Sequence, residues 1–587
     1  MSENNCVTLT IDDKEVTVKK GSTILDAARK LDIDIPTLCF LKDINEVGAC
    51  RMCLVEVEGA RGYLAACVAP AEDGMIVRTN TPKLLDTKKT VLELILSSHE
   101  KKCLTCIRNQ NCELQKLAEK FGLEDIEFEG EYPEKCFDDS SSCIVRNTAK
   151  CILCKRCVNV CKKVQKVAAI STMNRGFKSK VGVALDMGIK DSTCVGCGQC
   201  VINCPVGALS EKSNIKELEE MLSSHKKHIV IQTAPATRAT IGEEFGEKIG
   251  TLMTGKMVSG LKALGFDKVF DTDIGADVTI MEEATELIDR LSNGGKLPMI
   301  TSCSSGWITF AEKFYPEILD HLSTTKSPME ILGTIIKTYY AKQMKIKPED
   351  IYSVALMPCS AKKAEIEREN LLLENGLKPV DNVVTVREMS RLLKKHNIDL
   401  SKLEESNFDS PLGIATGAGH IFGRTGGVME AALRSAAVML KEPALSKVEF
   451  KPSKENQNIK EAKVMIAGKE INIAVVQTLK AASEIMDEIS SGDSKYSFIE
   501  VMTCPGGCVN GGGQPIIPES VKAKTDYIKL RSSALNKADE KENLRVSIDN
   551  PDVQKLYKDF FGKPNSEKAE KLLHTHYTKQ DCYCTKK

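Results

Sequence analysis

The sequence lacks the features that direct a protein to a membrane or to nucleic acid. Its 81 Lys and Arg side chains balance 81 Asp and Glu, so no charge excess would attract DNA, RNA or an anionic lipid surface. No apolar run approaches the ~18 residues of a membrane span. Residues 1–7 have neither the basic nor the apolar part of a signal peptide. We therefore expect a cytoplasmic protein with no nucleic-acid and no membrane partner.

Repeats are also scarce, because only one cysteine motif is doubled and no long low-complexity tract occurs. At 587 residues the chain is too long for one core, so we expect three to five domains. What the sequence has in excess is cysteine. There are 24, most of them with two or three residues between neighbours, and in a large cytoplasmic chain this pattern indicates metal ligation rather than disulfides.

Residues 1–82 have the pattern of a β-grasp domain. Residues 7–11 and 15–18 alternate apolar and polar around a turn, which predicts a hairpin. A helix follows with Ser22 as its N-cap and ends before Pro36. One isolated cysteine, a close pair and a distant fourth can then wrap a 2Fe-2S cluster with two thiolates on each iron. A structural zinc site is the alternative. These four residues are Cys39, Cys50, Cys53 and Cys67.

A second helix is predicted to begin at Thr81-Pro82 and to lead into residues 83–135, where one histidine precedes three cysteines. A histidine after a helix is often only a cap, but three cysteines within thirteen residues favour a 4Fe-4S cluster here. A neutral imidazole in place of a thiolate should raise the potential of this cluster. The predicted ligands are His99, Cys103, Cys106 and Cys112.

Residues 136–215 contain the doubled motif, Cys-x2-Cys-x2-Cys-x3-Cys, which predicts a ferredoxin-like domain with two 4Fe-4S clusters. In bacterial two-cluster ferredoxins the fourth cysteine of each run ligates the other cluster. We therefore assign Cys151, Cys154, Cys157 and Cys204 to one cube. The second cube would be held by Cys161, Cys194, Cys197 and Cys200.

Residues 216–578 alternate strands and helices, the pattern of a parallel sheet with crossover helices. Seven strands are expected, at 229–232, 269–270, 298–300, 352–357, 383–386, 473–476 and 498–502. Three of them run into Cys303, Cys359 and Cys504, and Cys508 follows. Ligands bind beyond the carboxyl ends of strands in open α/β sheets, so these cysteines could converge on one cluster. Residues 579–587, with Cys582 and Cys584, are predicted to form a disordered tail.

Three loops resemble the signature loops of FeFe-hydrogenases, and the resemblance covers nearly the whole chain. They are Thr301-Ser-Cys-Ser-Ser-Gly-Trp307, Met357-Pro-Cys-Ser-Ala-Lys-Lys-Ala-Glu365 and Cys504-Pro-Gly-Gly-Cys-Val-Asn-Gly-Gly-Gly-Gln-Pro515. The resemblance implies a two-lobed α/β hydrogenase domain holding an H-cluster. This cofactor is a 4Fe-4S cube on four thiolates, one of which bridges to a di-iron unit with carbonyl, cyanide and dithiolate ligands.

The resemblance also implies individual roles. By position Cys359, Cys504 and Cys508 ligate the cube, and Cys508 bridges to the di-iron unit. Lys362 would donate to a cyanide, and Pro235, Met357 and Met502 would line the pocket. A proton relay from solvent would use five residues, of which Glu283 and Glu286 lie three apart on one face of a predicted helix. Without the resemblance, such a pair would more often be a solvated face. The five are Arg290, Glu286, Ser323, Glu283 and Cys303.

The first loop departs from the family pattern, Thr-Ser-Cys-Cys-Pro-x-Trp, in which the first cysteine passes protons and the second ligates the cube. Here Ser304 holds the second position and Ser305 replaces the proline. A serine oxygen is a poorer iron ligand than a thiolate. Three alternatives follow: Cys303 shifts to ligate the cube, Ser304 ligates through oxygen, or one iron is under-ligated. We expect slower hydrogen turnover than in relatives with both cysteines.

The likeness is closest to long clostridial enzymes and to catalytic subunits of NAD(P)-linked complexes. It implies ferredoxin or a flavin- and NAD(P)H-binding subunit as electron partner, and maturation proteins that supply the di-iron unit. A hydrogen sensor or an iron–sulfur assembly factor is the first alternative, favoured by the altered loop. A plain electron-transfer subunit, as in NADH or formate dehydrogenase, is the second, but it explains only residues 1–215.

Overall fold

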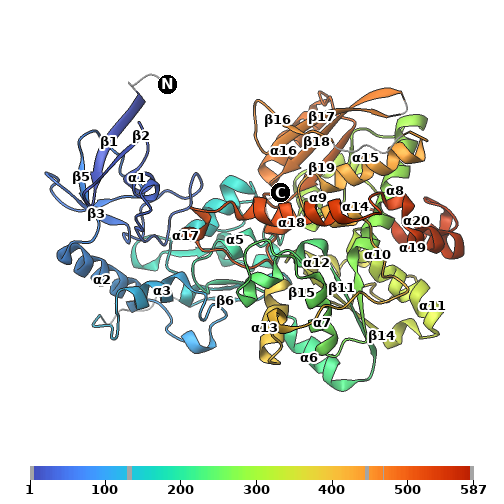
Figure 1. Ribbon diagram of the computed structural model, residues 1–587, viewed down its shortest axis with the longest axis horizontal. Helices are drawn as coiled ribbons and strands as arrows, with labels where there is room; N and C mark the ends of the chain where they lie inside the picture. Colours follow the sequence, from blue (N-terminus) through green and yellow to red (C-terminus); the bar gives the residue numbers. More distant parts are fainter. Residues whose placement is uncertain (1–4, 129–134, 443–447, 467, 582–587) are drawn as a thin grey trace.

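The computed structural model describes residues 5–128, 135–442, 448–466 and 468–581, so Cys582 and Cys584 of the predicted tail lie outside the described residues. The chain runs from a small N-terminal module at one end, through a cysteine-rich middle, to a larger body at the other end (Figure 1). No helix in these described ranges is both long enough and apolar enough to cross a bilayer.

The N-terminal module is a five-stranded sheet with one helix. Strands β1 (Cys6–Ile11), β2 (Lys14–Lys19), β3 (Leu54–Val57), β4 (Leu64–Ala65) and β5 (Ile76–Arg78) lie in the order β2-β1-β5-β3-β4. The predicted hairpin is confirmed, since β1 and β2 pair antiparallel from Cys6↔Lys19 to Ile11↔Lys14. The predicted N-cap is wrong. Thr23, not Ser22, caps α1 (Ile24–Lys30), because Thr23 and Asp26 form a reciprocal capping box.

The cysteine-rich middle contains short elements between loops. Helix α2 (Pro82–Ser97) has Thr81 as its N-cap, as predicted, and α3 (Glu113–Lys120) follows the His-Cys loop. Strands β6 (Phe137–Asp138), β7 (Ile144–Asn147) and β10 (Leu209–Glu211) form a sheet in the order β10-β7-β6. Helices α4 (Arg156–Asn159) and α5 (Gln199–Ile202) each begin after a left-handed residue, Lys155 and Gly198. The two cysteine runs are thus structurally equivalent.

The larger body contains two sheets with parallel strands, where the strand pattern alone had predicted a parallel sheet with crossover helices. The first has four parallel strands in the order β12-β11-β14-β15. The second has the order β13-β19-β18-β17-β16, in which β13, β19 and β18 are parallel and β17 and β16 (Lys451–Pro452) are antiparallel. All seven predicted strands exist: β11 (His228–Thr233), β12 (Lys268–Asp271), β13 (Met299–Ile300), β14 (Ile351–Met357), β15 (Asn382–Thr385), β18 (Lys469–Gln477) and β19 (Phe498–Met502).

The sequence did not predict β16 or β17 (Ile459–Ile466), and β17 pairs with β18 along its whole length. Most of its side chains are partly or fully exposed, and it carries three charged residues in eight. Antiparallel strands with one solvated face lack the continuous apolar run of a buried parallel strand, which is why this hairpin did not stand out.

Helix α8 (Thr272–Asn293) lies between the two sheets and joins their cores. Its Ile274 and Val278 pack with Val230 and Phe270 in the core of the first sheet. On its other side, Ala276 and Ile280 pack in the core of the second sheet. This 22-residue helix has apolar side chains on two sides, and each side packs against one lobe. The polar side chains along the helix therefore have fixed positions.

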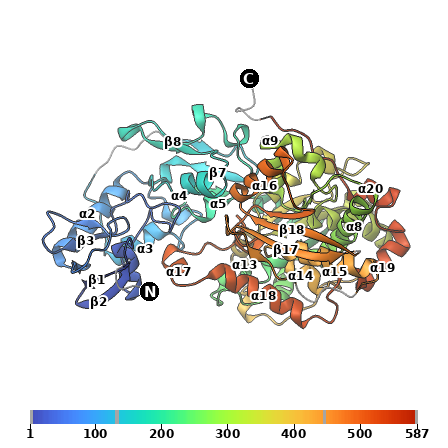
Figure 2. The same cartoon turned by 90° about the horizontal axis from the view of Figure 1, so that it is seen from above.

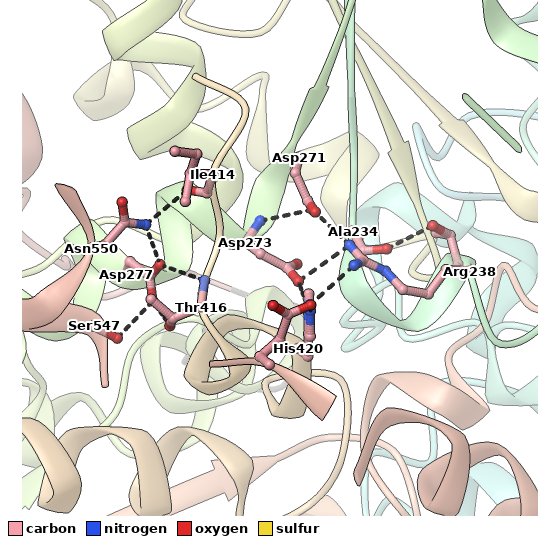
Figure 3. Close-up of polar contacts among 12 residues, drawn as sticks. Ala234, Arg238, Asp271, Asp273, Asp277, Ile414, Thr416, His420, Ser547 and Asn550 are labelled. Atoms are coloured by element: carbon pink, nitrogen blue, oxygen red, sulfur yellow. Dashed lines mark hydrogen bonds and ion pairs between the residues drawn. The ribbon is translucent and has the colours of Figure 1, made fainter. Parts of the chain in front are cut away.

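Buried charges fix the first turns of α8 (Figure 3). Arg238 forms ion pairs with Asp271 at 2.6 Å and with Asp273 at 3.2 Å. His420, on α14 (Gly417–Ile421), lies between Asp273 and Glu542. Burial alone would lower the pKa of His420, but its hydrogen bonds to Asp273 and Glu542 raise it to about 9.

Asp277, one turn further along α8, is the centre of a second group of hydrogen bonds in the same view (Figure 3). It accepts from the amide and hydroxyl of Thr416, from Ser547 and from Asn550. Burial raises the pKa of this carboxyl to about 6 even though these donors oppose the shift. The C-terminal part of the chain therefore helps to hold the start of α8.

The C-terminal part of the chain also contacts the N-terminal module. Helix α17 (Glu519–Lys522) lies between that module and the larger body in both views (Figures 1 and 2). Glu519 forms an ion pair with Arg29 at 3.5 Å, and Lys524 forms one with Asp32 at 3.0 Å. These contacts join the first and last parts of the sequence.

Candidate metal and catalytic centre

The four cysteines of the N-terminal module are all buried and lie together. Cys53 Sγ is 3.2 Å from Cys67 Sγ, and the thiol of Cys39 contacts those of Cys50 and Cys67. The amide of Leu38 donates to Cys50 Sγ at 3.4 Å. A compact set of four buried thiols, with a backbone donor aimed at sulfur, fits a 2Fe-2S cluster.

The His-Cys loop begins at the end of α2. His99 is buried, and its Nδ1 has no hydrogen-bond partner among the described residues. Burial lowers the pKa of this imidazole to about 4, and the charge of Lys150 adds to the shift, so the ring is neutral and free to ligate. Cys106 and Cys112 are half-buried, whereas Cys103 is exposed on the turn Cys103–Thr105. An orphaned, neutral ring nitrogen beside cysteines fits iron ligation.

The doubled motif brings its cysteines together in the crossed arrangement. One cavity is lined by all three leading cysteines of the first run and by the last cysteine of the second run, namely Cys151, Cys154, Cys157 and Cys204. The second set is completed by the last cysteine of the first run. Its members are Cys161, Cys194, Cys197 and Cys200. Burial raises the pKa of these thiols, and the charge of one member raises the pKa of another further, so we call them electrostatic neighbours.

No three His, Cys, Asp or Glu side chains within the described ranges are placed to hold a single metal ion. A 4Fe-4S cube differs in spreading its four thiolates over four irons. The buried, converging thiols of each set therefore suit a cluster better than one ion.

The second ferredoxin set lies directly against the loops of the larger body. Ser360 Oγ donates to the carbonyl of Gly196 at 2.7 Å, and Gln199 Nε2 donates to the carbonyl of Asn510 at 2.8 Å. A Cβ on Gly512 would lie 2.5 Å from the carbonyl oxygen of Cys197. Backbones that approach this closely allow no side chain between them. Cys359 and Cys504 are also electrostatic neighbours of Cys197.

Cysteines from both sheets meet at this junction. Cys359 follows β14 of the first sheet, and Cys504 follows β19 of the second. Cys508 begins the short turn Cys508–Asn510, after Gly507 in a conformation with φ 91°. Burial raises the pKa of Cys508 to about 12, and the neighbouring Cys359 adds to the shift. Three thiols from two lobes, one buried and two partly buried, thus lie near one another, which fits a shared cluster between the lobes.

The predicted pocket residues lie at the same strand ends. Met357 is the last residue of β14 and Met502 the last of β19, and both are buried. Pro235 opens the turn Pro235–Thr237 just after Ala234, which packs in one small core with Met357. The amide of Ala234 donates to the carbonyl of Leu356 at 3.1 Å. The three expected pocket residues are therefore carried by segments that border the cysteines.

Lys362 is buried beside Cys303. Its Nζ donates to the carbonyl of Cys303 at 3.2 Å and to both carboxylate oxygens of Glu365, at 3.0 and 2.7 Å. Glu365 also accepts from the hydroxyls of Ser305 and Ser327. Burial would lower the pKa of Lys362, but Glu365 raises it, so the buried ammonium stays charged. Such a charge needs a hydrogen-bonded partner in a low-dielectric site.

Sequence reasoning gave no role to Glu365, although it lies in the second signature loop. The signal that could have found it is its position three residues after Lys362, which puts both on one face of α12 (Lys362–Glu365). Ser305, which replaces the family proline, contributes one of the donors that hold this carboxylate. The proline could not have done so.

Three of the expected relay residues, Arg290, Glu286 and Ser323, are joined by hydrogen bonds. Glu286 Oε2 accepts from Ser323 Oγ at 2.8 Å, and Glu286 Oε1 accepts from Arg290 at 2.6 Å. Ser323 is placed by its amide, which donates to the carbonyl of Ile300 on β13 at 2.8 Å. Arg290 is partly exposed and also donates to the carbonyl of Leu322 at 2.8 Å. Arg290 therefore marks the solvent end of the group.

Glu283 is the inner acid. It is fully buried, and neither of its carboxylate oxygens has a hydrogen-bond partner among the described residues. Burial, followed by the charge of Glu286, raises its pKa to about 8. The charge of Glu283, after burial, raises the pKa of Cys303 well above its ordinary value. Glu283 is thus a protonated acid near neutral pH, between Glu286 and Cys303.

Cys303 and Ser304 face different neighbours. Cys303 is an electrostatic neighbour of Glu283 and of Cys508. Ser304 Oγ lies 2.9 Å from Thr503 Oγ1 and accepts from the amide of Thr503 at 3.4 Å. Thr503 directly precedes Cys504, and its carbonyl accepts from Gln165 of the ferredoxin module at 3.0 Å. Residue 304 therefore lies on the side of the ferredoxin module and residue 303 on the side of the acids.

Several family models match the chain in order. The 2Fe-2S iron-sulfur cluster binding domain matches residues 4–82, and the NADH-ubiquinone oxidoreductase-G iron-sulfur binding region matches 88–127. The 4Fe-4S dicluster domain matches residues 150–208. The iron only hydrogenase large subunit, C-terminal domain, matches 227–512, and the iron hydrogenase small subunit matches 525–580.

Known proteins resemble the chain over most of its length. It is 45% identical to NADP-reducing hydrogenase subunit HndD of Solidesulfovibrio fructosivorans, over 98% of this chain and 99% of that protein. It is 41% identical to iron hydrogenase 1 of Clostridium pasteurianum, over 97% and 100%. The solved structure of an apo [FeFe]-hydrogenase HydA1 variant from Chlamydomonas reinhardtii covers 63% of this chain and 99% of its own, with 34% identity and a TM-score of 0.57.

Proposed function

Because this chain belongs to the iron-only, or FeFe, hydrogenases, we propose that Cys359, Cys504 and Cys508 hold its H-cluster between the two lobes. As a member of this family the protein is an oxidoreductase that interconverts hydrogen with protons and electrons. Its 2Fe-2S and 4Fe-4S domains relay the electrons. The hydrogen-sensor alternative is not favoured, since the relatives that match over nearly their full length are named as hydrogenases.

The observation that carries the proposal is the convergence of cysteines at the junction. Cys359 comes from the first sheet and Cys504 and Cys508 from the second, and Cys504 is buried while Cys359 and Cys508 are partly buried. The backbone of Cys197 packs on Gly512 beside them. An electron leaving the second ferredoxin cube thus has the catalytic thiolates as its neighbours.

When bound, the H-cluster supplies an iron site at which hydrogen is cleaved or formed. The residues of this chain then have separate tasks. Lys362, kept charged by Glu365, would donate to a cyanide of the di-iron unit. Pro235, Met357 and Met502 would exclude water from the pocket. Cys303, Glu283, Ser323, Glu286 and Arg290 would move a proton between that pocket and solvent.

We infer that Cys303 keeps the proton-carrying role and that Ser304 occupies the fourth ligand position of the cube. Two observations support this. Cys303 has Glu283 as its electrostatic neighbour, on the side of the relay. Ser304 instead contacts Thr503, beside Cys504 and the ferredoxin module. A shift of Cys303 into the ligand position would take the thiol away from Glu283.

We propose four relay clusters: one 2Fe-2S cluster in residues 1–82, one 4Fe-4S cluster in 83–135 and two in 136–215. The hydrogenase domain then spans residues 216–578, with a tail at 579–587. Support comes from the buried sets of thiols and from the neutral ring of His99. His99, Cys103, Cys106 and Cys112 would hold the cluster with one imidazole ligand.

For the electron partner we propose a flavin-containing subunit that handles NAD(P)H, with ferredoxin as the alternative. The relative from Solidesulfovibrio is named as a subunit of an NADP-reducing hydrogenase, and no nicotinamide-binding motif stands out in this chain. Maturation proteins would supply the di-iron unit. We propose a cytoplasmic location, where reduced NAD(P)H is available.

Anaerobically matured protein tests the proposal. The wild type should reduce a viologen dye with hydrogen, and Cys508→Ser should lose this activity while keeping the iron of the relay clusters. Cys6→Ser is the matched control, because Cys6 is exposed and belongs to none of the cysteine sets. A wild-type protein that carries relay iron and the di-iron unit but never reduces dye with hydrogen would overturn the proposal.

A further inference from the structure

The proton relay has a branch at Glu286 that none of the expected roles uses. The amide of Thr324 donates to Glu286 Oε2 at 3.2 Å, and Thr324 Oγ1 lies 3.5 Å from the same oxygen. On its other side, Thr324 Oγ1 lies 2.7 Å from Nδ1 of His574. One hydroxyl therefore lies between a relay carboxylate and an imidazole, and a hydroxyl can donate and accept at once.

The far side of the imidazole faces a buried carboxylate. Nε2 of His574 lies 3.0 Å from Glu282 Oε2, and Glu282 is fully buried on α8. Glu282 also accepts from the amide of Asn565 at 2.7 Å and from the hydroxyl of Tyr557. Burial and the charge of Glu282 raise the pKa of Tyr557 well above its ordinary value, so Tyr557 remains a donor.

These contacts fix the tautomer of neutral His574. Because the carboxylate of Glu282 can only accept, Nε2 carries the hydrogen and donates to it. Nδ1 then presents its lone pair to the hydroxyl of Thr324, which donates. The same geometry suits the imidazolium, whose Nδ1 hydrogen would donate to Thr324 Oγ1 and leave the hydroxyl hydrogen free to point at Glu286.

The backbone holds this arrangement in place. Residues 573–575 pair with 324–326: the amide of Lys326 donates to the carbonyl of Leu573, and the amide of Thr575 donates to the carbonyl of Thr324, both at 2.8 Å. Thr325 and His574 form an isolated bridge. The imidazole is thus carried by a paired segment after α20 (Glu567–Leu573), not by a loose end.

We propose that His574 is a proton-holding side branch of the relay, which exchanges one proton with Glu286 through the hydroxyl of Thr324. In the forward step, Glu286 gives its proton to Thr324 Oγ1 as the hydroxyl gives its own to Nδ1 of His574. A carboxylic acid and a neutral imidazole become a carboxylate and an imidazolium, with no change in total charge. His574 touches no reacting atom and acts only through Glu286.

The charges around His574 favour such a role. Two carboxylates of α8 lie on either side of the imidazole: Glu282 contacts it directly, and Glu286 contacts it through Thr324. Arg290, which opposes an imidazolium, is already paired with Glu286 at 2.6 Å. Tyr557 is neutral. Other ionisable groups of the neighbouring elements are Lys326 on the paired segment, Glu330 on α10 (Pro328–Ile335), and Glu570 and Lys571 on α20. An imidazole is the side chain best suited to load and release a proton near neutral pH.

The branch predicts opposite pH effects for the two directions of the reaction. Hydrogen evolution consumes protons, so a loaded His574 helps most at low pH. Hydrogen uptake releases protons, so an empty His574 helps most at high pH. A residue that only stabilises the fold would lower both rates alike at every pH. The ratio of wild-type to variant rate, measured against pH in both directions, separates the two roles.

The variants are His574→Gln, which cannot take up a proton, and Thr324→Val, which keeps the shape of threonine without its hydroxyl. We expect each to lower evolution at the acid end and uptake at the alkaline end by about 3- to 10-fold, with little change at the opposite ends. The double variant should be no slower than either single one, since both interrupt the same branch. Thr324→Ser should restore the wild-type profile.

His576→Gln is the matched control, because His576 lies two residues further along the same segment and is exposed. The inference rests on the proposed function, which the hydrogenase activity of the wild type tests separately. A wild type without this activity would overturn the proposed function. With an active wild type, a wild-type to variant ratio that stays flat with pH in both directions overturns the branch. So does a Thr324→Ser variant that behaves like Thr324→Val. If His574→Gln does not fold, the comparison of Thr324→Val with Thr324→Ser tests the branch by itself.

Discussion

Ser304 Oγ lies 2.9 Å from the hydroxyl oxygen of Thr503, the residue that precedes Cys504. This contact places the residue that departs most from the family pattern on the cube side of the junction. It also leaves Cys303, one residue earlier, next to Glu283, the inner acid. In the assignment proposed above, the loss of a thiolate at residue 304 affects the cube, and the proton relay keeps its thiol.

Replacing Ser304 by cysteine should raise hydrogen turnover, because a thiolate is a better iron ligand than a hydroxyl. We expect an increase of several-fold per loaded H-cluster, measured as hydrogen evolution from a reduced dye. Ser304→Ala is the companion variant, and it should be no faster than the wild type. An unchanged or lower rate for Ser304→Cys would contradict the assignment of residue 304.

Removing the acid from Glu286 should slow catalysis in both directions. Glu286→Gln keeps the shape but cannot carry the proton between Ser323 and Arg290, so we expect a loss of about 10²-fold or more. Asp289→Asn is the control, since Asp289 lies on the same helix but is exposed. The two variants are compared by hydrogen evolution and hydrogen uptake at equal iron content. Equal losses in both would show that the helix, and not the relay, had been damaged.

The stability of the larger body should depend on the protonation of His420. Its pKa is raised from 6.5 to about 9 in the folded protein. The stability that it contributes is therefore complete below pH 6.5 and is lost as the pH rises through 9. His420→Gln should lower the unfolding free energy by on the order of 3 kcal/mol at pH 6 and by little at pH 10.

The control variant is His396→Gln, because His396 is exposed. Thermal midpoints across this pH range provide the measurement, and a difference that does not shrink with pH would contradict the prediction.

A side chain at residue 512 should interrupt the electron path. The Cβ of Gly512→Ala would meet the carbonyl oxygen of Cys197 at 2.5 Å and the Cα of Gly198 at 2.6 Å, so the ferredoxin module must move away. Dye reduction by hydrogen should fall by about tenfold or more, because electron transfer weakens steeply as the gap between clusters widens. Isotope exchange between hydrogen and water needs no relay electrons and should fall much less.

Gly62→Ala is the control for that variant, because nothing lies within 4 Å of a Cβ at Gly62. Dye reduction and isotope exchange that fall together in Gly512→Ala would place the damage at the catalytic thiols instead of the relay.

Local patterns predicted much of this molecule. The β1–β2 hairpin, the start of α2 at Pro82 and all seven strands of the larger body follow from apolar periodicity and capping residues. The spacing of the cysteines predicts which thiols share a site, and Cys151, Cys154, Cys157 and Cys204, the first predicted ferredoxin set, line one cavity. These features depend on residues close in sequence or on a strict repeat.

What could not be predicted depends on long-range packing. The periodicity of a strand does not say which sheet it joins, so the strand pattern could not divide the seven strands between the two sheets. The ion pair of Arg238 with Asp271, and the contact of His574 with Glu282, join segments 33 and 292 residues apart. No local pattern marks such pairs, because a buried charge looks like a surface charge until its partner is known. Glu365 could have been predicted as a partner of Lys362, because it lies three residues later. Only the structure shows that the two side chains are buried and form an ion pair.

The infrared spectrum of the anaerobically matured protein tests the central claim most directly. If Cys359, Cys504 and Cys508 hold the H-cluster at the end of the relay, the wild type should show carbonyl and cyanide stretches that change when hydrogen is added. Cys508→Ser should lack these bands and keep its relay iron. A wild-type protein with full relay iron that never shows carbonyl or cyanide bands after maturation would contradict the account.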